Sequence, residues 1–208
     1  MKSIVVNSNF SSMYLQFGKR IFDFIVASVC LVILLPIIGI TAISILLTSG
    51  LPILFTQERV GRKGKIFKIK KFRTMYVRKV KDSSITVAGD QRITPIGRYL
   101  RRWKLDELPQ LWNVLVGEMS LVGPRPDVSG YADKLQGDAQ HLLLLRPGIT
   151  GPATLAYKNE EEILAKVNDP VLYNNEIIYP DKVRINLEYM KHCSLLQDLY
   201  YCFKTIYS

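Results

Sequence analysis

The amino-acid sequence predicts an α+β protein, mainly α-helical, with one apolar membrane helix near the N-terminus and a compact domain of short strands and amphipathic surface helices after it. Its 208 residues carry a formal net charge of +10, yet 48% of them are hydrophobic. No charged residue occurs between Asp23 and Glu58. Farther along, apolar residues recur mostly at helical spacing. These observations divide the chain into a tail (1–16), a membrane helix (17–52) and a domain (53–208).

The apolar segment FIVASVCLVILLPIIGITAISILL is long enough to cross a bilayer as a helix. Pro36 removes one backbone hydrogen bond, so we expect a kink or break near Leu35. Basic residues flank the segment on both sides and favour the cytoplasmic side of a membrane. A re-entrant helix with both ends cytoplasmic and a kinked spanning helix both satisfy this pattern. Either topology holds the basic domain at the cytoplasmic face.

The combination of basic charge and apolar residues points to nucleic acid, an anionic bilayer or phosphorylated substrates. The glycines of VGRKGKIF do not have the spacing of a P-loop. The three cysteines have no metal-binding spacing, so neither a zinc site nor a disulfide framework is expected. A helix-turn-helix is not expected either, because SLVGPRP interrupts the chain where a recognition helix would follow. We therefore expect no nucleic-acid partner.

The first part of the domain is expected to hold a strand, a loop and a helix. IFKIKKF alternates as a short strand does, and Gly61 and Gly64 occupy turn positions before it. Residues 79–91 are polar and predict a mobile loop. Residues 95–104 have apolar positions at helical spacing, which places the intervening arginines on other faces.

Four further helices are expected in the rest of the chain. The first covers 107–116 and ends at Gly117, after which VGPRPD and LLRPGITGP predict stiff loops. Acidic residues 160–162 suit the first turn of the second helix. The last two helices are expected to be capped by Asp181 and by Ser194, which is followed three residues later by a glutamine. Their apolar stripes are expected to pack in the core.

Two adjacent carboxylates, Asp106 and Glu107, follow a basic run and are the candidates for chemistry. If Asp106 caps the helix over 107–116, its third helical residue is Pro109, which has no N–H to donate. One carboxylate oxygen would then remain free. The helix N-terminus and nearby arginines favour the ionised form. Such a group could be a nucleophile, a magnesium ligand or simply a solvated cap.

Arginines on separate elements surround this acidic pair in the predicted arrangement. A guanidinium fork suits bidentate contacts to phosphate. Pro124 and Pro126 stiffen the chain on both sides of one of these arginines. The candidate phosphate-binding arginines are Arg73, Arg98, Arg101, Arg125 and Arg146.

Three segments in this order, QERVGRKGKIFKIKKFRTM, GRYLRRWKLDELPQLWNVLVGEMSLVGPRP and RPGITG, resemble the monotopic phosphoglycosyl transferases among bacterial sugar transferases. The resemblance runs from about Phe17 to the end. It implies transfer of a phospho-sugar from a nucleotide sugar, usually a UDP-sugar, to polyprenyl (undecaprenyl) phosphate, with Mg²⁺ as cofactor and release of UMP. This reaction is the first membrane step of glycoconjugate or polysaccharide assembly.

The resemblance also implies a topology and partners. The family's N-terminal segment is a re-entrant helix in the bacterial inner membrane, with the catalytic domain on the cytoplasmic face. That favours a re-entrant helix here, although the sequence has Leu35-Pro36 where many members have Ser-Pro. Membrane lipids and a second copy in a homodimer are the remaining expected partners, and the chain is expected to be a minimal catalytic core. The alternative is a membrane-anchored scaffold that recruits polysaccharide enzymes without chemistry.

Site residues are carried over by position. Asp106 corresponds to the nucleophile of a ping-pong reaction, which would carry a covalent phospho-sugar. Glu107 would assist through the metal or through proton transfer, so both carboxylates are candidate Mg²⁺ ligands. Pro124 and Pro126 would shape the loop near the nucleotide. Residues in the resemblance that would hold substrate phosphate are Lys71, Arg101, Arg125 and Arg146.

Overall fold

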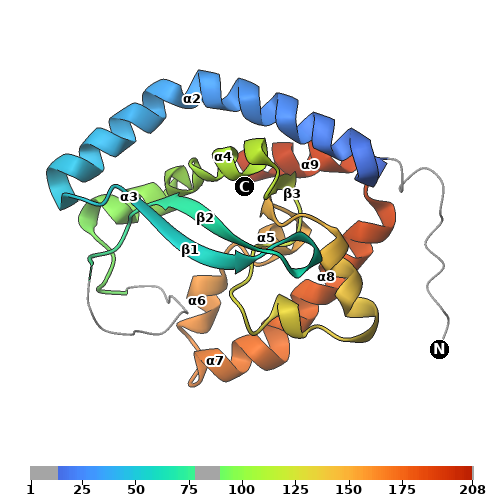
Figure 1. Ribbon diagram of the computed structural model, residues 1–208. Coiled ribbons are helices and arrows are strands. Elements are labelled where there is room, and N and C mark those ends of the chain that lie inside the picture. The colour runs from blue at the N-terminus through green and yellow to red at the C-terminus, as the bar shows by residue number, and fades with distance from the viewer. Residues whose placement is uncertain (1–13, 78–89, 208) are drawn as a thin grey trace.

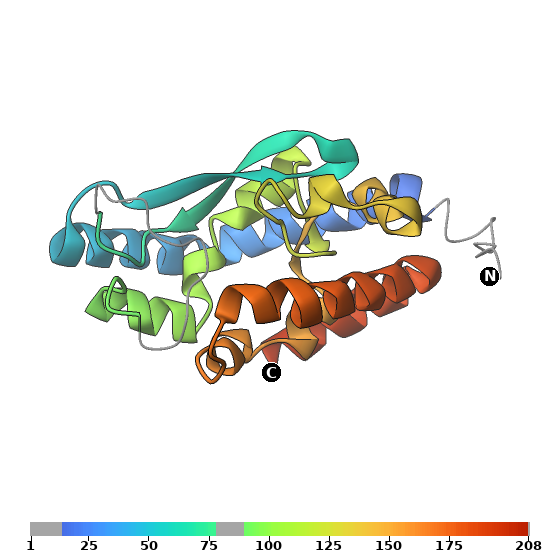
Figure 2. The same ribbon diagram turned by 90° about the horizontal axis from the view of Figure 1, so that it is seen from below.

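The computed structural model describes residues 14–77 and 90–207 and is mostly helical, with two small sheets. The predicted loop at 79–91 falls mostly outside the described residues. Figures 1 and 2 show one long helix lying along a compact domain. The helices are α2 (Lys19–Ser49), α3 (Pro95–Arg102), α4 (Gln110–Val116), α5 (Pro152–Ala156), α6 (Glu160–Leu164), α7 (Pro170–Tyr173), α8 (Tyr179–His192) and α9 (Leu195–Ile206). The strands are β1 (Leu54–Val60), β2 (Ile66–Phe72), β3 (Ser120–Val122) and β4 (Gly148–Thr150).

Helix α2 is continuous through Pro36, so of the kink or break expected near Leu35, the break does not occur. A proline removes one hydrogen bond, and the bonds of the turns on either side hold the helix together. Figure 1 shows the continuous helix α2 as an arch over the domain. Among the described residues, α2 is the helix long and apolar enough to cross a membrane by length and composition.

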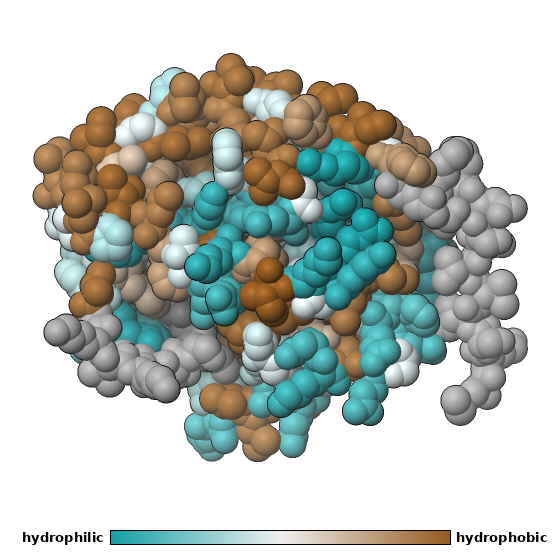
Figure 3. Space-filling view, in the orientation of Figure 1, coloured by the Kyte–Doolittle hydropathy of each residue, from teal (hydrophilic) through white to brown (hydrophobic). Residues whose placement is uncertain are grey.

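Both ends of α2 are fastened to the same domain. Near its start, the Asp23 carboxylate accepts a hydrogen bond of 3.0 Å from the Leu121 N–H. Near its end, Arg73 donates to the carbonyls of Ser49 and Gly50. Side chains along the middle of the arch face outward, and Val32 is 75% exposed. Figure 3 shows the result as a hydrophobic band over α2, with hydrophilic residues gathered below it.

Strand β2 and the turn before it form as the sequence predicts, and β1, which was not predicted, completes a hairpin with them. The two strands pair antiparallel, and the turn between them, Arg62–Gly64, ends with Gly64 at a φ of 73°. Helix α3 starts directly after Thr94. The Thr94 hydroxyl accepts the Gly97 N–H and so caps the helix. Helix α4 ends at Gly117 with a φ of 88°, which confirms the predicted C-cap.

The two proline- and glycine-rich loops contain a pair of parallel strands that the sequence did not predict. Strands β3 and β4 pair Ser120 with Gly148 and Val122 with Thr150. The backbones then approach so closely that a Cβ on Gly148 would lie 2.2 Å from the Gly123 nitrogen. The glycines are therefore needed for close packing of the two loops, which brings the segment after β3 beside the segment before α5.

The C-terminal helices differ in part from the prediction. Helix α8 follows a π-helical segment (Asn174–Ile178) without a break, so Asp181 is not its cap. Pro180 is tolerated because it stands in the first turn of α8. Ser194 caps α9 as predicted, accepting the Gln197 N–H at 3.4 Å.

The apolar stripes of the last two helices have different environments. In α8, Val183, Leu187 and Met190 pack against the core, as predicted. In α9, Leu196 is 79% exposed and Ile206 is 75% exposed, so the prediction of core packing is wrong for this helix. The reason is that α9 packs on β3 and β4 through its other face, where Asp198 is buried.

Candidate active site

A cavity of about 850 Å³ contains both carboxylates of the candidate site. Its walls come from the end of β2, from α3 and the turn after it, from the loop that follows β3, and from α5, α6 and α8. Segments more than 80 residues apart therefore form one site. Of the predicted site residues, those that line the cavity are Lys71, Arg98, Arg101, Asp106, Glu107, Pro124 and Arg125.

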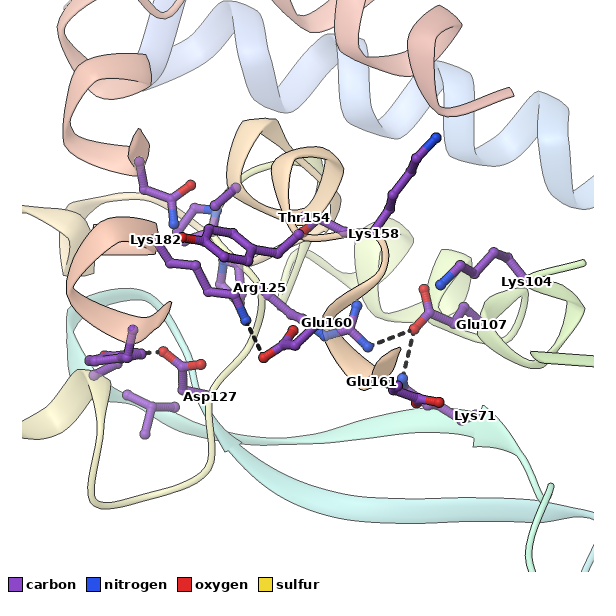
Figure 4. Close-up of a pocket in the computed structure, with 18 of the residues that line it drawn as sticks. Lys71, Lys104, Glu107, Arg125, Asp127, Thr154, Lys158, Glu160, Glu161 and Lys182 are labelled. Carbon is purple, nitrogen blue, oxygen red and sulfur yellow. Dashed lines mark hydrogen bonds and ion pairs between the residues drawn. The ribbon is translucent and has the colours of Figure 1, made fainter. Parts of the chain in front are cut away.

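The Glu107 carboxylate is held by two cations. The Lys71 Nζ donates to its Oε1 at 2.7 Å, and the Arg125 Nη2 donates to the same oxygen at 3.1 Å (Figure 4). Burial alone would raise the pKa of Glu107, but the charges of Arg125 and Lys71 outweigh it and hold this pKa well below its usual range. Glu107 is therefore a fixed anion that orients both cations at the cavity wall.

Asp106 has a different environment from its neighbour. It lies in a 3-10 turn, Leu105–Glu107, and α4 begins only at Gln110, so the prediction that Asp106 caps a helix over 107–116 is wrong. Within the described part of the chain, no hydrogen bond or ion pair forms to the Asp106 side chain.

The pKa of Asp106 is raised, whereas the sequence predicted that its surroundings favour the ionised form. Burial raises the pKa of its carboxyl, and the negative charge of Glu107 adds to the rise. The charges of Lys71, Arg101 and Lys104 oppose it. The predicted effect of the helix N-terminus does not operate, because Asp106 is not at the start of α4.

The remaining predicted arginines fall into two groups. Arg98 and Arg101 line the cavity, and the Arg101 Nη1 donates to Glu161 at 3.1 Å. Arg73 and Arg146 lie outside the cavity walls and donate to backbone carbonyls. Arg146 donates through Nε to the Gly117 carbonyl at 2.9 Å, at the C-terminal end of α4. Pro126 is buried beside the cavity loop, and its carbonyl accepts from Arg59.

Comparison with known proteins identifies the family. Residues 14–208 match the sequence model described as bacterial sugar transferase. The chain belongs to the bacterial sugar transferase family.

Three relatives illustrate the match. The chain is 35% identical to the UDP-galactose-lipid carrier transferase of Erwinia amylovora over 97% of its own length and 42% of that protein. It is 36% identical to the UDP-glucose:undecaprenyl-phosphate glucose-1-phosphate transferase of Klebsiella pneumoniae over 91% of the chain and 39% of that protein. The exopolysaccharide production protein ExoY of Sinorhizobium fredii is 32% identical, with coverage of 91% and 84%. The chain spans about two fifths of the length of the first two relatives.

This sugar transferase offers oxygen ligands that fit a magnesium ion. Magnesium is commonly bound by one or two carboxylates, with substrate phosphates and water completing the shell. The Asp106 carboxylate and the second oxygen of Glu107 form no hydrogen bond to the described protein residues. No group of three or more acidic, histidine or cysteine side chains suited to a metal occurs in the described ranges 14–77 and 90–207. The two carboxylates are therefore the candidate protein ligands, with substrate phosphates and water to complete the shell.

Sequence reasoning missed the part of the cavity formed by α5, α6 and α8. Asp127 lies two residues after Arg125, and Lys182 donates to Glu160 at 2.6 Å across the cavity wall. Lys104 adopts a left-handed backbone conformation with a φ of 54° and reaches the same space. The position of Asp127 close to the arginine was a signal in the sequence. Nothing local to α8 indicated that it would face the carboxylates.

Proposed function

We propose that this chain transfers a phospho-sugar from a UDP-sugar to polyprenyl phosphate, releases UMP and forms a polyprenyl-diphospho-sugar. The observation that carries the proposal is the unpaired Asp106 carboxylate in a cavity whose other anion, Glu107, is already paired with Lys71 and Arg125. The names of its relatives supply the substrates, since they include UDP-glucose, UDP-galactose and undecaprenyl phosphate.

In the proposed first step, an oxygen of ionised Asp106 attacks the β-phosphorus of the donor. A P–O bond to that oxygen forms, the bond joining the β-phosphorus to UMP breaks, and UMP leaves with the bonding electrons. In the second step, an oxygen of polyprenyl phosphate attacks the same phosphorus and restores the Asp106 carboxylate. Lys71 and Arg125 face the phosphate region, held in place by Glu107, and stabilise negative charge there.

The Asp106 and Glu107 carboxylates would hold Mg²⁺ together with the donor phosphates. When bound, the ion neutralises charge on the diphosphate, which allows a carboxylate to approach it. The protein's own cations act in the same direction. Lys71, Arg101 and Lys104 lower the proton affinity of Asp106 and so increase the fraction that is ionised for attack.

The attachment of α2 supports a re-entrant topology, and the basic residues that flank the helix favour the cytoplasmic face for the domain. A helix of 31 residues is about 46 Å long, enough to span a hydrocarbon core of about 30 Å. A perpendicular span would place its ends on opposite sides of the membrane. Here Asp23 and the Ser49 carbonyl are both bonded to one domain, so the exposed middle of the arch is the part that would enter the bilayer. The donor nucleotide sugar would reach the cavity from the cytoplasm.

The test is nucleotide release by the detergent-solubilised protein with magnesium and a panel of UDP-sugars, before any lipid is added. We expect a stoichiometric burst of UMP from one donor and a matching increase in protein mass. Both should disappear in Asp106→Asn. The matched control is Asp138→Asn, an exposed aspartate outside the cavity, which should keep the burst.

Other outcomes separate the parts of the proposal. UMP release that requires polyprenyl phosphate would keep the transferase and remove the covalent intermediate. Folded protein that releases no UMP under either condition would support the membrane-anchored scaffold. Activity in Asp106→Asn would overturn the assignment of the nucleophile.

A further inference from the structure

The cavity extends away from Glu107, and two residues that line it have a buried side-chain atom with no hydrogen-bond partner in the described structure. Figure 4 shows Lys71, Lys104 and Glu107 on one side and Asp127 and Lys182 on the other, with Arg125 and Glu160 between them. The cations near Glu107 suit the diphosphate of a donor. The opposite end contains a different set of groups, which the reaction steps above do not use.

Asn186 is the clearest of these groups. It lies on α8, lines the cavity and is only 5% exposed. Its side-chain oxygen is shielded from solvent and has no hydrogen-bond partner among the described residues. A buried amide without partners costs free energy, and native structures rarely keep one without a role. A rotation of the amide would turn this oxygen toward the cavity, where a ligand that offers hydroxyl groups would provide the missing partner.

Thr154 repeats this pattern on the neighbouring helix. It lies on α5, which packs against α8, and lines the same cavity. A helical threonine usually donates to the carbonyl four residues earlier. That carbonyl, on Thr150, already accepts the Gly123 N–H at 2.9 Å, and the Thr154 hydroxyl is buried without a partner in the described structure.

Asp127 and Tyr179 complete the polar end. The Tyr179 hydroxyl donates to the Asp127 carboxylate at 3.3 Å, and the Asp127 carbonyl accepts the Val60 N–H, which fixes the loop. Burial raises the pKa of Asp127 to about 6, against the charge of Lys182. A carboxylate in this position disfavours a phosphate nearby and suits hydroxyl donors.

We infer that Asn186 and Thr154, together with Asp127, bind the sugar ring of the donor and decide which sugar is accepted. This inference rests on the proposed function. A hexose presents several hydroxyls, each both a donor and an acceptor, which match an amide, a hydroxyl and a carboxylate that converge from separate elements. The ribose of the nucleoside also carries hydroxyls, so binding of UMP is the measurement that separates the hexose from the nucleoside at these residues.

The experiment measures UMP release from UDP-glucose, UDP-galactose, UDP-N-acetylglucosamine and UDP-N-acetylgalactosamine by the full chain. Thr154→Val keeps the shape of the side chain and removes its hydroxyl, and Asn186→Ser shortens the amide. We expect each variant to lose about 10- to 100-fold in kcat/KM for the preferred donor and to change the ratio between donors. The dissociation constant of UMP, which lacks the transferred hexose, should stay within about twofold.

Two control substitutions match the tested ones in chemistry and lie outside the cavity. Thr48→Val removes a hydroxyl on α2 that donates to the Ser44 carbonyl, and Asn175→Ser shortens an exposed amide. Both should leave the ratio between donors unchanged. Circular dichroism of each variant shows whether it folds. If Asn186→Ser does not fold, the isosteric Thr154→Val still tests the inference.

Three results would overturn the inference. A donor ratio unchanged in both folded, active variants would remove the sugar assignment alone. Weaker UMP binding in step with the loss of kcat/KM would assign this end to the nucleoside. Absence of UMP release by the unsubstituted protein with every donor would overturn the proposed function and this inference with it.

Discussion

Two groups of charged side chains in this protein differ in how completely their charges are paired. Where α2 meets α8 and α9, the carboxylate of Asp198 is fully buried and accepts hydrogen bonds from Tyr14, Lys19 and Tyr189. We call these four residues the anchor cluster. In the cavity, Glu107 is paired with two cations, while Asp106 has no such partner among the described residues. A fully paired anion stabilises the fold, whereas an unpaired one remains available to a substrate.

The largest effect is expected from breaking the anchor cluster. Asp198→Asn keeps the shape of the side chain but leaves the Lys19 ammonium buried without a counter-charge. We expect the free energy of unfolding in detergent to fall by about 3–5 kcal/mol. Asp106→Asn is the comparison, and it should change the free energy by less than about 1 kcal/mol because no pair is lost. Equal losses in the two variants would contradict the contrast between the clusters.

Glu107→Gln should have the next largest effect, because it removes the charge that holds Lys71 and Arg125. We expect a loss of about 2 kcal/mol in the free energy of unfolding, reduced from the fully buried case because Arg125 is partly exposed. Chemical denaturation measures this loss, and UMP release measures the accompanying fall in activity. A variant as stable as the unsubstituted protein would show that these cations are held by other contacts.

A smaller effect concerns the pH dependence of activity. Burial and Glu107 raise the pKa of Asp106, so activity should increase as the pH rises through that pKa and the carboxyl loses its proton. Lys104→Gln removes a charge that lowers this pKa. The acid side of the pH–activity profile should therefore move to higher pH.

Lys63→Gln is the matched control for the pH experiment. Lys63 also has a left-handed backbone, with a φ of 57°, but it lies in the β1–β2 turn and outside the cavity walls. The pH–activity profile of Lys63→Gln should not shift from that of the unsubstituted protein. A shift of the same size in both variants would assign the effect to net charge and not to the neighbourhood of Asp106.

The smallest effect is expected from Glu161→Gln, which removes a partly exposed ion pair with Arg101. The free energy of unfolding should change by less than about 1 kcal/mol. Arg101 would then be free for the donor phosphates, so the KM for the donor should fall while kcat stays unchanged. Steady-state kinetics would show this, and an increase in KM would mean that Glu161 orients Arg101 for binding.

The sequence predicted those features that depend on neighbours along the chain. The β2 strand, the turn at Gly64, the C-cap at Gly117 and the N-cap at Ser194 all form as predicted. Each depends on backbone geometry or on hydrogen bonds within a few residues. The parallel pair of β3 and β4 was missed because its strands are separated by 25 residues and are only three residues long.

The candidate site could be predicted only in part. Five arginines share the same chemistry in the sequence, but only three of them line the cavity, since Arg73 and Arg146 donate to backbone carbonyls. A guanidinium binds a carbonyl oxygen as readily as it binds a phosphate oxygen. Which of the two it meets depends on the elements that pack around it, and the pattern of residues does not contain that information.

The sequence by itself determined the long apolar helix, its basic flanks and the adjacent carboxylates, because length, charge and order along the chain are local properties. Only the tertiary structure decided that both ends of α2 are bonded to one domain, that the pKa of Asp106 is raised, and that Asn186 and Thr154 share a cavity with it. These outcomes depend on burial and on distances between residues far apart in the chain. Desolvation and ion pairing then act through space, on whichever groups the fold has brought together.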